Sequence, residues 1–267
     1  MRYKLSAPAT LHTTIQLPAS KSISNRALIL HALAQGHIAP SNLSDCDDTR
    51  VMIKALDGNP GHIDILAAGT AMRFLTAYLS VTPGTRIITG TERMQQRPIR
   101  ILVDALRELG AQIEYAGKEG FPPLRITGTE LTGEEISLAG NVSSQYISAL
   151  LMIGPILKNG LRLNLTGEII SRPYINLTLQ LMKEFGADAA WSSESSITVR
   201  PGKYRDIPFT VESDWSGASY WYQMVALIQD NEKKESTKTE IKLPGLLPRS
   251  YQGDSRGAEI FAKLGVH

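Results

Sequence analysis

The sequence predicts a mixed α/β (α+β) fold built from a repeated unit, and three observations support this prediction. An apolar, helix-like run follows a cluster of small polar residues around Lys21. An amphipathic helix that begins near Arg-Pro and ends at Gly-Ala occurs twice, after Arg97 and after Arg172. Two short strand-like segments follow each of these helices. Helices and strands that alternate in this way are typical of α/β and α+β domains.

Glycines at the helix ends mark the repeat, because the position after a helix favours a left-handed backbone. Gly110 and Gly186 end the two Arg-Pro helices, and Gly265 ends a shorter copy at residues 255–266. The strand pairs are expected at residues 112–115 with 124–127, and at 188–191 with 197–200.

Another helix with a small, polar start precedes each copy. These helices are expected at residues 69–79, 142–151 and 214–224. The Lys21 helix takes this position in the first unit, followed by a helix at 48–56 and by closing strands shortened to 58–65. The repeated unit is therefore β-α-β-α-β-β, and it occurs about four times.

The repeats predict two domains. Residues 20–211 are expected to form a complete three-unit substrate-binding domain. Residues 1–19 and 212–267 are expected to form part of a second domain, because the last copy stops where the others continue into two strands. The charged segment 229–239 is expected to be an exposed hairpin or loop.

Composition narrows the class of protein. The chain of 267 residues is 42% hydrophobic and 20% charged, as is ordinary for a soluble globular protein. Its net charge of +2 is too small to indicate nucleic-acid binding, and the lone Cys46 suits a reducing compartment. The start of the chain does not resemble a signal peptide, and the apolar run 147–157 is too short to span a bilayer. We expect a soluble, cytoplasmic monomer that binds neither nucleic acid nor membranes.

The strongest functional signal is an anion site around Lys21, Ser22 and Arg26. Unpaired N–H groups and the positive end of the helix dipole attract anions to the first turn of a helix. Lys21 and Arg26 add two positive charges at the same place. A capped helix with solvated charges is the structural alternative, but the density of anion-binding groups favours a site.

A second helix start carries Ser143, Ser144 and Gln145 without a charge. An N-cap alone accounts for one serine, so capping and ligand binding stay open here with equal weight.

Arginines and a glycine offer further binding groups. Arg97 precedes a proline, and its planar fork suits a carboxylate or a phosphate. Arg172, beside Ser171 and Tyr174, holds the corresponding repeat position, so one of the two arginines can be structural. Gly69 begins a helix tightly enough for a ligand to approach the backbone, although a close strand–helix turn is an equal alternative.

Other residues favour structure over chemistry. The acidic cluster Asp45, Asp47 and Asp48 beside Arg50 predicts a helix cap with a local ion pair rather than a metal site. The five histidines show no metal-ligand spacing, and the chain has neither a GxGxxG motif nor a P-loop.

Seven short motifs follow one another along the chain, at residues 20–26, 47–50, 68–73, 93–98, 142–146, 171–174 and 214–219. Together they resemble the 5-enolpyruvylshikimate-3-phosphate synthase family, the enolpyruvyl transferases of the shikimate pathway. The motifs occur in the family's order and cover essentially the whole chain. The resemblance implies two domains of three units each in the inside-out prism arrangement, with the second domain incomplete in this chain.

The resemblance also implies roles for individual residues in binding shikimate 3-phosphate and phosphoenolpyruvate. The expected ligands of shikimate 3-phosphate are Lys21, Ser22, Arg26, Ser143, Ser144 and Ser171, with Gln145 and Tyr174 lining the site. The expected ligands of phosphoenolpyruvate are Gly69 and Arg97, together with Lys21. No metal and no organic cofactor is implied.

The implied reaction moves the enolpyruvyl group of phosphoenolpyruvate to the 5-hydroxyl of shikimate 3-phosphate, with release of phosphate, in chorismate and aromatic amino acid biosynthesis. The family's acid/base residues are expected beyond His267, so we expect no catalytic residue in this chain and little or no turnover. One alternative is a non-catalytic fragment or anion-binding module of the same fold. A UDP-N-acetylglucosamine enolpyruvyl transferase is disfavoured, because Ser22 follows Lys21 where that family has Asn and no Cys lies near Arg97.

Overall fold

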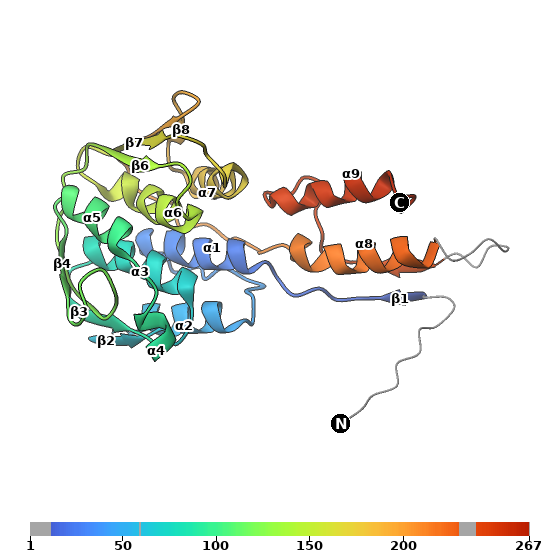
Figure 1. Ribbon diagram of the computed structural model, residues 1–267, viewed down its shortest axis with the longest axis horizontal. Coiled ribbons are helices and arrows are strands. Elements are labelled where there is room, and N and C mark those ends of the chain that lie inside the picture. The colour runs from blue at the N-terminus through green and yellow to red at the C-terminus, as the bar shows by residue number, and fades with distance from the viewer. Residues whose placement is uncertain (1–11, 59, 230–238, 267) are drawn as a thin grey trace. The chain divides into compact units, whose positions relative to one another are not determined.

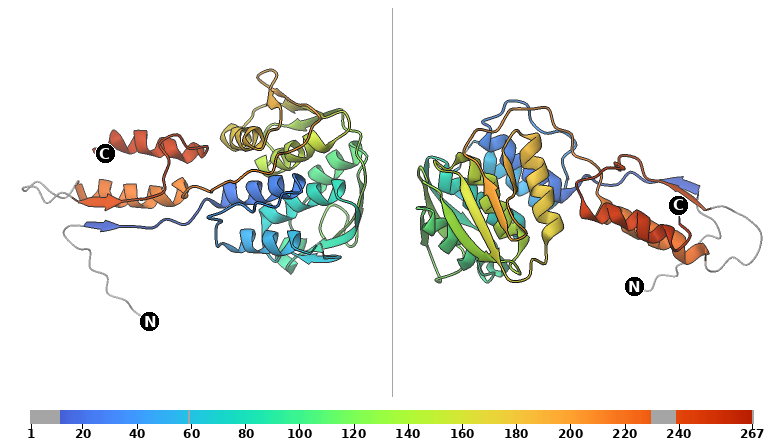
Figure 2. Two further views of the ribbon diagram at one scale, coloured as in Figure 1. Left: turned by 180° about the vertical axis from the view of Figure 1, so that it is seen from behind. Right: turned by 90° about the horizontal axis from the view of Figure 1, so that it is seen from above.

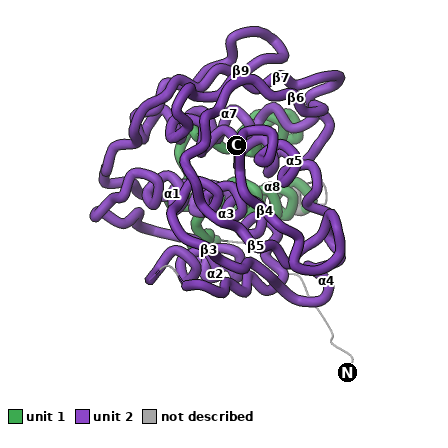
Figure 3. The backbone as a smooth tube through the Cα atoms, turned by 90° about the vertical axis from the view of Figure 1, so that its left-hand side faces the viewer, with its two compact units in different colours: residues 1–20, 212–267 green, residues 21–211 purple. Residues whose placement is uncertain are grey.

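The computed structural model describes residues 12–58, 60–229 and 239–266. The chain divides into two compact units, one of residues 21–211 and one of residues 1–20 with 212–267 (Figure 3). Most of the charged segment expected at 229–239 lies outside the described residues. Every helix in the described residues is shorter or less apolar than a membrane span requires.

Two four-stranded sheets of identical topology form the outer layer of the larger unit (Figure 1). In each sheet the first two strands are parallel, and a closing hairpin adds two antiparallel strands. The predicted β-α-β-α-β-β unit is therefore confirmed for residues 62–128 and 135–199. The first sheet has the order β2 (His62–Asp64), β3 (Gly84–Thr89), β5 (Leu124–Gly128) and β4 (Gln112–Tyr115), and the second has β6 (Glu135–Ala139), β7 (Leu161–Thr166), β9 (Ser196–Val199) and β8 (Ala189–Trp191).

Each of the two units that contain a sheet has two main helices: an inner helix that is almost fully buried, and an outer helix that is exposed along one face. The inner helices are α3 (Gly69–Val81) and α6 (Ser144–Ile153), which are buried on nearly all faces. Such burial suits helices with apolar residues around the whole circumference. The outer helices, α5 (Arg100–Glu108) and α7 (Arg172–Glu184), alternate buried and exposed positions as amphipathic helices do.

The helix α1 (Lys21–Leu33) is the third inner helix. Its residues 23–30 are all buried, and it packs against α3, α6, α7 and the short α2 (Asp47–Leu56). The two views in Figure 2 show α1 lying among the other helices of this unit. A helix in this position can carry its N-terminal side chains to the place where the neighbouring helices begin.

The first unit differs from its prediction in one respect. The strand β2 is the one strand described within residues 58–65, and it pairs with β3 as the opening strand of the next unit. Twelve residues separate Leu56, where α2 ends, from Gly69, where α3 begins. So short a connection holds this opening strand and leaves little room for a closing hairpin, so the expectation of shortened closing strands was wrong.

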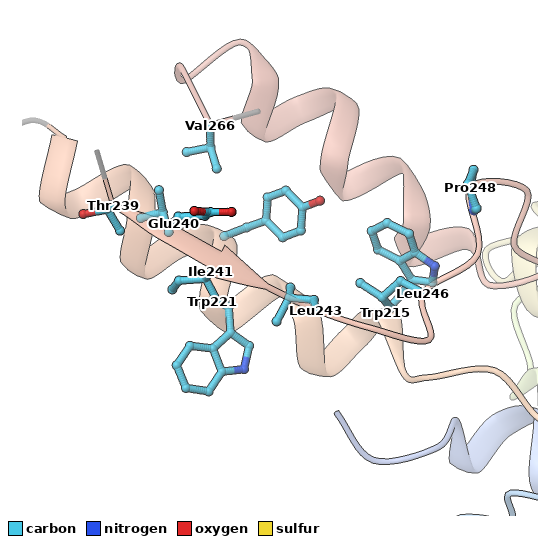
Figure 4. Close-up of a pocket in the computed structure, with 11 residues that line it drawn as sticks. Trp215, Trp221, Thr239, Glu240, Ile241, Leu243, Leu246, Pro248 and Val266 are labelled. Atoms are coloured by element: carbon cyan, nitrogen blue, oxygen red, sulfur yellow. The ribbon is translucent and has the colours of Figure 1, made fainter. Parts of the chain in front are cut away.

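The smaller unit has little core of its own. Strand β1 (His12–Thr14) pairs in parallel with β10 (Glu240–Lys242), beside the helices α8 (Trp215–Gln229) and α9 (Gly257–Ala262). Residues from α8 and β10 help to line a groove of about 460 Å³ (Figure 4). The sequence of α8 is apolar all round, like that of the inner helices, yet Tyr220 and Leu227 are 67% and 62% exposed.

The short elements are single turns: α4 (Glu92–Gln95), η1 (Gly154–Ile156) and η2 (Gly253–Arg256).

Candidate functional site

The N-termini of three helices in the larger unit are joined by hydrogen bonds. Gln145 at the start of α6 donates from Nε2 to Oγ1 of Thr70 at the start of α3, over 3.2 Å. The backbone N–H of Thr70 donates to Oδ1 of Asp48 in the first turn of α2, over 3.4 Å. The positive ends of these helix dipoles therefore lie close together.

Arg26 connects three helices from within the protein. It is 3% exposed, and its Nε and Nη2 donate to Thr178 Oγ1 of α7 at 2.7 Å and to Ser148 Oγ of α6 at 3.0 Å. Its Nη1 donates to the carbonyl of Ser22, one turn earlier in α1, at 2.8 Å. These bonds give Arg26 a structural role that sequence reasoning missed, and its contact with a substrate stays a prediction.

The charge of Arg26 is buried away from the acidic side chains that the structure describes. No carboxylate among the described residues forms an ion pair with it. Burial lowers the pKa of Arg26 from 12.5 to about 10, so the group is still a cation at neutral pH. A buried and unpaired cation favours a nearby anion, because few water molecules are available to solvate the charge.

Lys21 and Ser22 begin α1 at the surface. The side chain of Lys21 is exposed, and it makes no hydrogen bond or ion pair with any residue that the structure describes. Ser22 is half-buried. The two predicted ligands are therefore placed where an anion from solvent can reach them.

Arg97 lies against Gly69. A Cβ on Gly69 would come within 2.5 Å of Nη1 and 2.9 Å of Nη2 of Arg97, so only glycine lets the guanidinium group approach this closely. Partial burial lowers the pKa of Arg97, and the neighbouring charge of Arg73 lowers it further. Two arginines therefore face the same helix start.

Arg73 is the second of these arginines, and no role was predicted for it from the sequence. It is 5% exposed, and its Nη1 donates to the carbonyl of Gly69 at 2.9 Å. Its Nε is buried without a hydrogen-bond partner among the described residues. Arg73 is the one charged residue of α3. Burial of a charge is costly unless the charge is compensated, so a functional role at this position could have been predicted from the sequence.

A cavity lies beside the exposed residues 95–98, which form the Arg97 loop. It has a volume of about 440 Å³ and is lined by Ala67, Arg93, Met94 and Arg97. Two of its four lining residues are cationic, so its chemistry suits a small anion.

The serines predicted to hold a phosphate divide into two groups. Ser143 caps α6, because its Oγ accepts from the backbone N–H of Gln145 at 3.4 Å. Ser171 occupies the N-cap of α7 but makes no side-chain capping bond, and Ser144 at the start of α6 is half-buried. Tyr174, in the first turn of α7, is 43% exposed. Among these residues Ser143 makes a capping bond, and the binding of a phosphate by Ser143, Ser144 and Ser171 stays a prediction.

Arg172 is the structural member of the arginine pair. Its Nη2 donates to the carbonyl of Glu194 at 2.6 Å, and its guanidinium carbon lies 4.3 Å from the centre of the Trp191 ring. These contacts hold the β8–β9 hairpin on α7. Arg97 has no comparable hydrogen bond from its side chain to a described residue, which leaves its planar fork available.

The acidic cluster does not form the predicted ion pair. Within the described residues, Arg50 pairs with none of the neighbouring aspartates, and Cys46 caps α2 without a side-chain bond. Asp48 accepts from the N–H of Thr70 instead, because the start of α2 lies beside that of α3. No group of three His, Cys, Asp or Glu side chains in the described parts of the chain could hold a metal ion.

Comparison with known sequences gives one family. A family model described as EPSP synthase (3-phosphoshikimate 1-carboxyvinyltransferase) matches residues 5–58 and 59–267. A 3-phosphoshikimate 1-carboxyvinyltransferase of Bacteroides fragilis is 72% identical over 266 residues, covering 100% of this chain and 63% of that protein. One of Shewanella halifaxensis is 39% identical over 281 residues, covering 95% of this chain and 64% of that protein.

Solved structures share the fold. One structure of EPSP synthase from Acinetobacter baumannii has a TM-score of 0.74 at 22% identity and covers 89% of this chain and 57% of its own. Another from the same organism has a TM-score of 0.71 at 23% identity, over 82% of this chain and 54% of its own. The chain spans about 63% of the length of the Bacteroides relative.

Proposed function

Because the chain belongs to the EPSP synthase (3-phosphoshikimate 1-carboxyvinyltransferase) family, we propose that it is part of an enzyme that makes 5-enolpyruvylshikimate 3-phosphate. The enzyme transfers the 1-carboxyvinyl group of phosphoenolpyruvate to the 5-hydroxyl of shikimate 3-phosphate and releases phosphate. Both substrates are polyanions, so the site must first concentrate positive potential.

One observation carries this proposal. Four cationic residues gather at or beneath the starts of α1 and α3, and none forms an ion pair with a described carboxylate. Because these cations lie at helix starts, their charges add to the positive ends of the helix dipoles, and the combined potential suits a polyanion. The four residues are Lys21, Arg26, Arg73 and Arg97.

In the proposed complex, the phosphate of shikimate 3-phosphate lies at the helix starts that carry hydroxyl groups. Lys21 supplies the charge, and Ser22, Ser144 and Ser171 supply O–H donors beside free backbone N–H groups. Ser143 holds the first turn of α6 in shape for this contact. Gln145 and Tyr174 line the rest of the site.

Phosphoenolpyruvate is proposed to bind beside Gly69 and Arg97, within reach of Lys21. Arg97 can bind a carboxylate or a phosphate through two parallel N–H donors. Because Gly69 has no side chain, the guanidinium group of Arg97 can lie against the backbone at this position. Arg26 and Arg73 are buried in the protein, so their side chains act as fixed positive charges that stabilise the bound anions.

We assign no catalytic acid or base to this chain. The family's proton-transferring groups are proposed to lie in the part of the relatives that the chain does not span. The chain by itself is therefore expected to bind substrate phosphates and to turn over little or not at all.

A chimera tests the proposed reaction. The chain would be joined to the remaining portion of the 72% identical Bacteroides fragilis relative, and phosphate release from phosphoenolpyruvate would be measured with shikimate 3-phosphate. We expect turnover from the chimera and a large loss of turnover with Lys21→Ala. A folded chimera that binds shikimate 3-phosphate without releasing phosphate would favour a non-catalytic anion-binding module instead.

A further inference from the structure

Tyr146, in the first turn of α6, connects two parts of the proposed phosphoenolpyruvate site. It is 8% exposed. Its hydroxyl donates to the carbonyl of Pro98 at 2.8 Å, and Pro98 directly follows Arg97. The face of its ring lies under Arg73, whose guanidinium carbon is 5.6 Å from the ring centre.

These contacts close a ring of interactions around Gly69. Arg73 donates to the Gly69 carbonyl, and Arg97 lies against the Gly69 Cα. Tyr146 then joins Arg73 to the Arg97 loop from the side of α6. A single side chain from another repeat unit thus contacts both arginine-bearing segments.

The Arg97 loop depends on this contact for its link to α6. The backbone bonds of residues 95–97 are local, since Arg97 N donates to Met94 O at 3.0 Å and Gln95 N donates to Thr91 O at 3.0 Å. The next residue after Pro98, Ile99, is held by a distant partner, because its N–H donates to Gly120 O at 2.9 Å. Residues 95–98 are exposed. Without the Tyr146 hydroxyl, these exposed residues would keep local bonds and lose their hydrogen bond to the helix.

The ring of Tyr146 also offsets the electrostatic repulsion between Arg73 and Arg97. Arg73 and Arg97 are like charges close enough for Arg73 to lower the pKa of Arg97. The electron-rich ring face attracts a guanidinium group. The ring therefore holds Arg73 in its buried position while the hydroxyl restrains the loop.

We propose that Tyr146 is a positioning residue for Arg97, fixing the loop that carries it through the Pro98 carbonyl while its ring secures Arg73. The inference rests on the proposed function for the identity of the anion, phosphoenolpyruvate, that Arg97 binds. Small displacements of a binding group weaken binding and catalysis strongly, so a residue that fixes Arg97 determines how well this anion is held.

The test is Tyr146→Phe in the 267-residue chain, which removes the hydroxyl and keeps the ring. Tyr115→Phe is the matched control. Tyr115 also lies under an arginine, with Arg107 at 5.0 Å, but its hydroxyl has no hydrogen-bond partner among the described residues. Amide exchange of residues 94–99 is measured by mass spectrometry, and binding of each substrate is measured by calorimetry.

We expect exchange at residues 94–99 to accelerate in Tyr146→Phe and not in Tyr115→Phe. The dissociation constant for phosphoenolpyruvate should rise about three- to tenfold, the usual effect of one lost hydrogen bond, and that for shikimate 3-phosphate should stay the same. Unchanged exchange overturns the inference. Faster exchange with unchanged phosphoenolpyruvate affinity also overturns it, because Tyr146 would then be merely structural.

Failure of the proposed function has a different signature. If the wild-type chain binds no phosphoenolpyruvate, the assignment of that anion to Arg97 fails, and the exchange of residues 94–99 alone then decides whether Tyr146 positions the loop. Equal weakening for both substrates would contradict a specific role at Arg97.

Discussion

The guanidinium group of Arg97 lies against the Cα of Gly69, where an added Cβ would stand 2.5 Å from Nη1. Glycine at this helix start is therefore a requirement of the arginine. The backbone of Gly69 is helical and would accept alanine by itself. Glycine is therefore needed at this position to make room for Arg97, and not to allow the conformation of the backbone.

Gly69→Ala should displace Arg97 without disturbing the fold. We expect the dissociation constant for phosphoenolpyruvate to rise about tenfold, equivalent to ~1.4 kcal/mol, because a methyl group 2.5 Å from Nη1 would force the guanidinium group of Arg97 to move. Shikimate 3-phosphate should bind as before. Calorimetry with both ligands checks this, and an equal loss for both would mean that the two subsites are not separate.

Arg26→Lys should destabilise the larger unit although it keeps the charge. Lysine cannot reproduce a planar fork that reaches Ser22, Ser148 and Thr178 at once. We expect the free energy of unfolding in urea to fall by about 2 kcal/mol. Arg162→Lys, an exposed position on β7, is the control and should change nothing. Equal stability of both variants would show that the three bonds contribute little.

Stability should depend on pH through Asp206. Its carboxylate accepts from the backbone N–H groups of His37 at 2.7 Å and Ile38 at 3.2 Å, and the His37 bond contributes most to lowering the pKa of Asp206 below 3.8. A carboxylate with a lowered folded-state pKa stabilises the fold above its unfolded value, and this contribution is lost as the pH falls through the folded value.

The difference in unfolding free energy between wild type and Asp206→Asn should therefore favour the wild type at neutral pH, where the carboxylate is ionised. It should shrink as the pH falls below 3.8. Urea denaturation at several pH values measures this difference. A difference that is the same at pH 3 and pH 7 would assign the effect of the variant to shape rather than to charge.

The repeat was predictable because its signals are local. Helix-ending glycines such as Gly110 and Gly186, both with positive φ, and short alternating strands can each be recognised within a few residues. Copies of the same unit then predict the same topology, and the two four-stranded sheets have it. The prediction of shortened closing strands in the first unit was wrong, because the pairing of a strand depends on the neighbouring unit.

The site was less predictable because its geometry is not local. Nothing near Arg26 in the sequence indicates that its partner is Thr178, 152 residues away. Arg97 and Arg172 occupy equivalent repeat positions, and the contacts of Arg172 with Glu194 and Trp191 indicate that Arg172 is the structural one. Asp48 likewise bonds to the neighbouring helix rather than to nearby Arg50.

The central claim is that the start of α1 binds the phosphate ester of shikimate 3-phosphate. Calorimetry of the 267-residue chain with shikimate 3-phosphate, for wild type and Lys21→Ala, tests it most directly. Lys183→Ala, an exposed lysine in the last turn of α7, is the control for a lost surface charge. We predict measurable binding by wild type and by Lys183→Ala, and affinity at least about tenfold weaker for Lys21→Ala. Equal affinity in all three proteins, or no binding by the folded wild-type chain, would contradict the account.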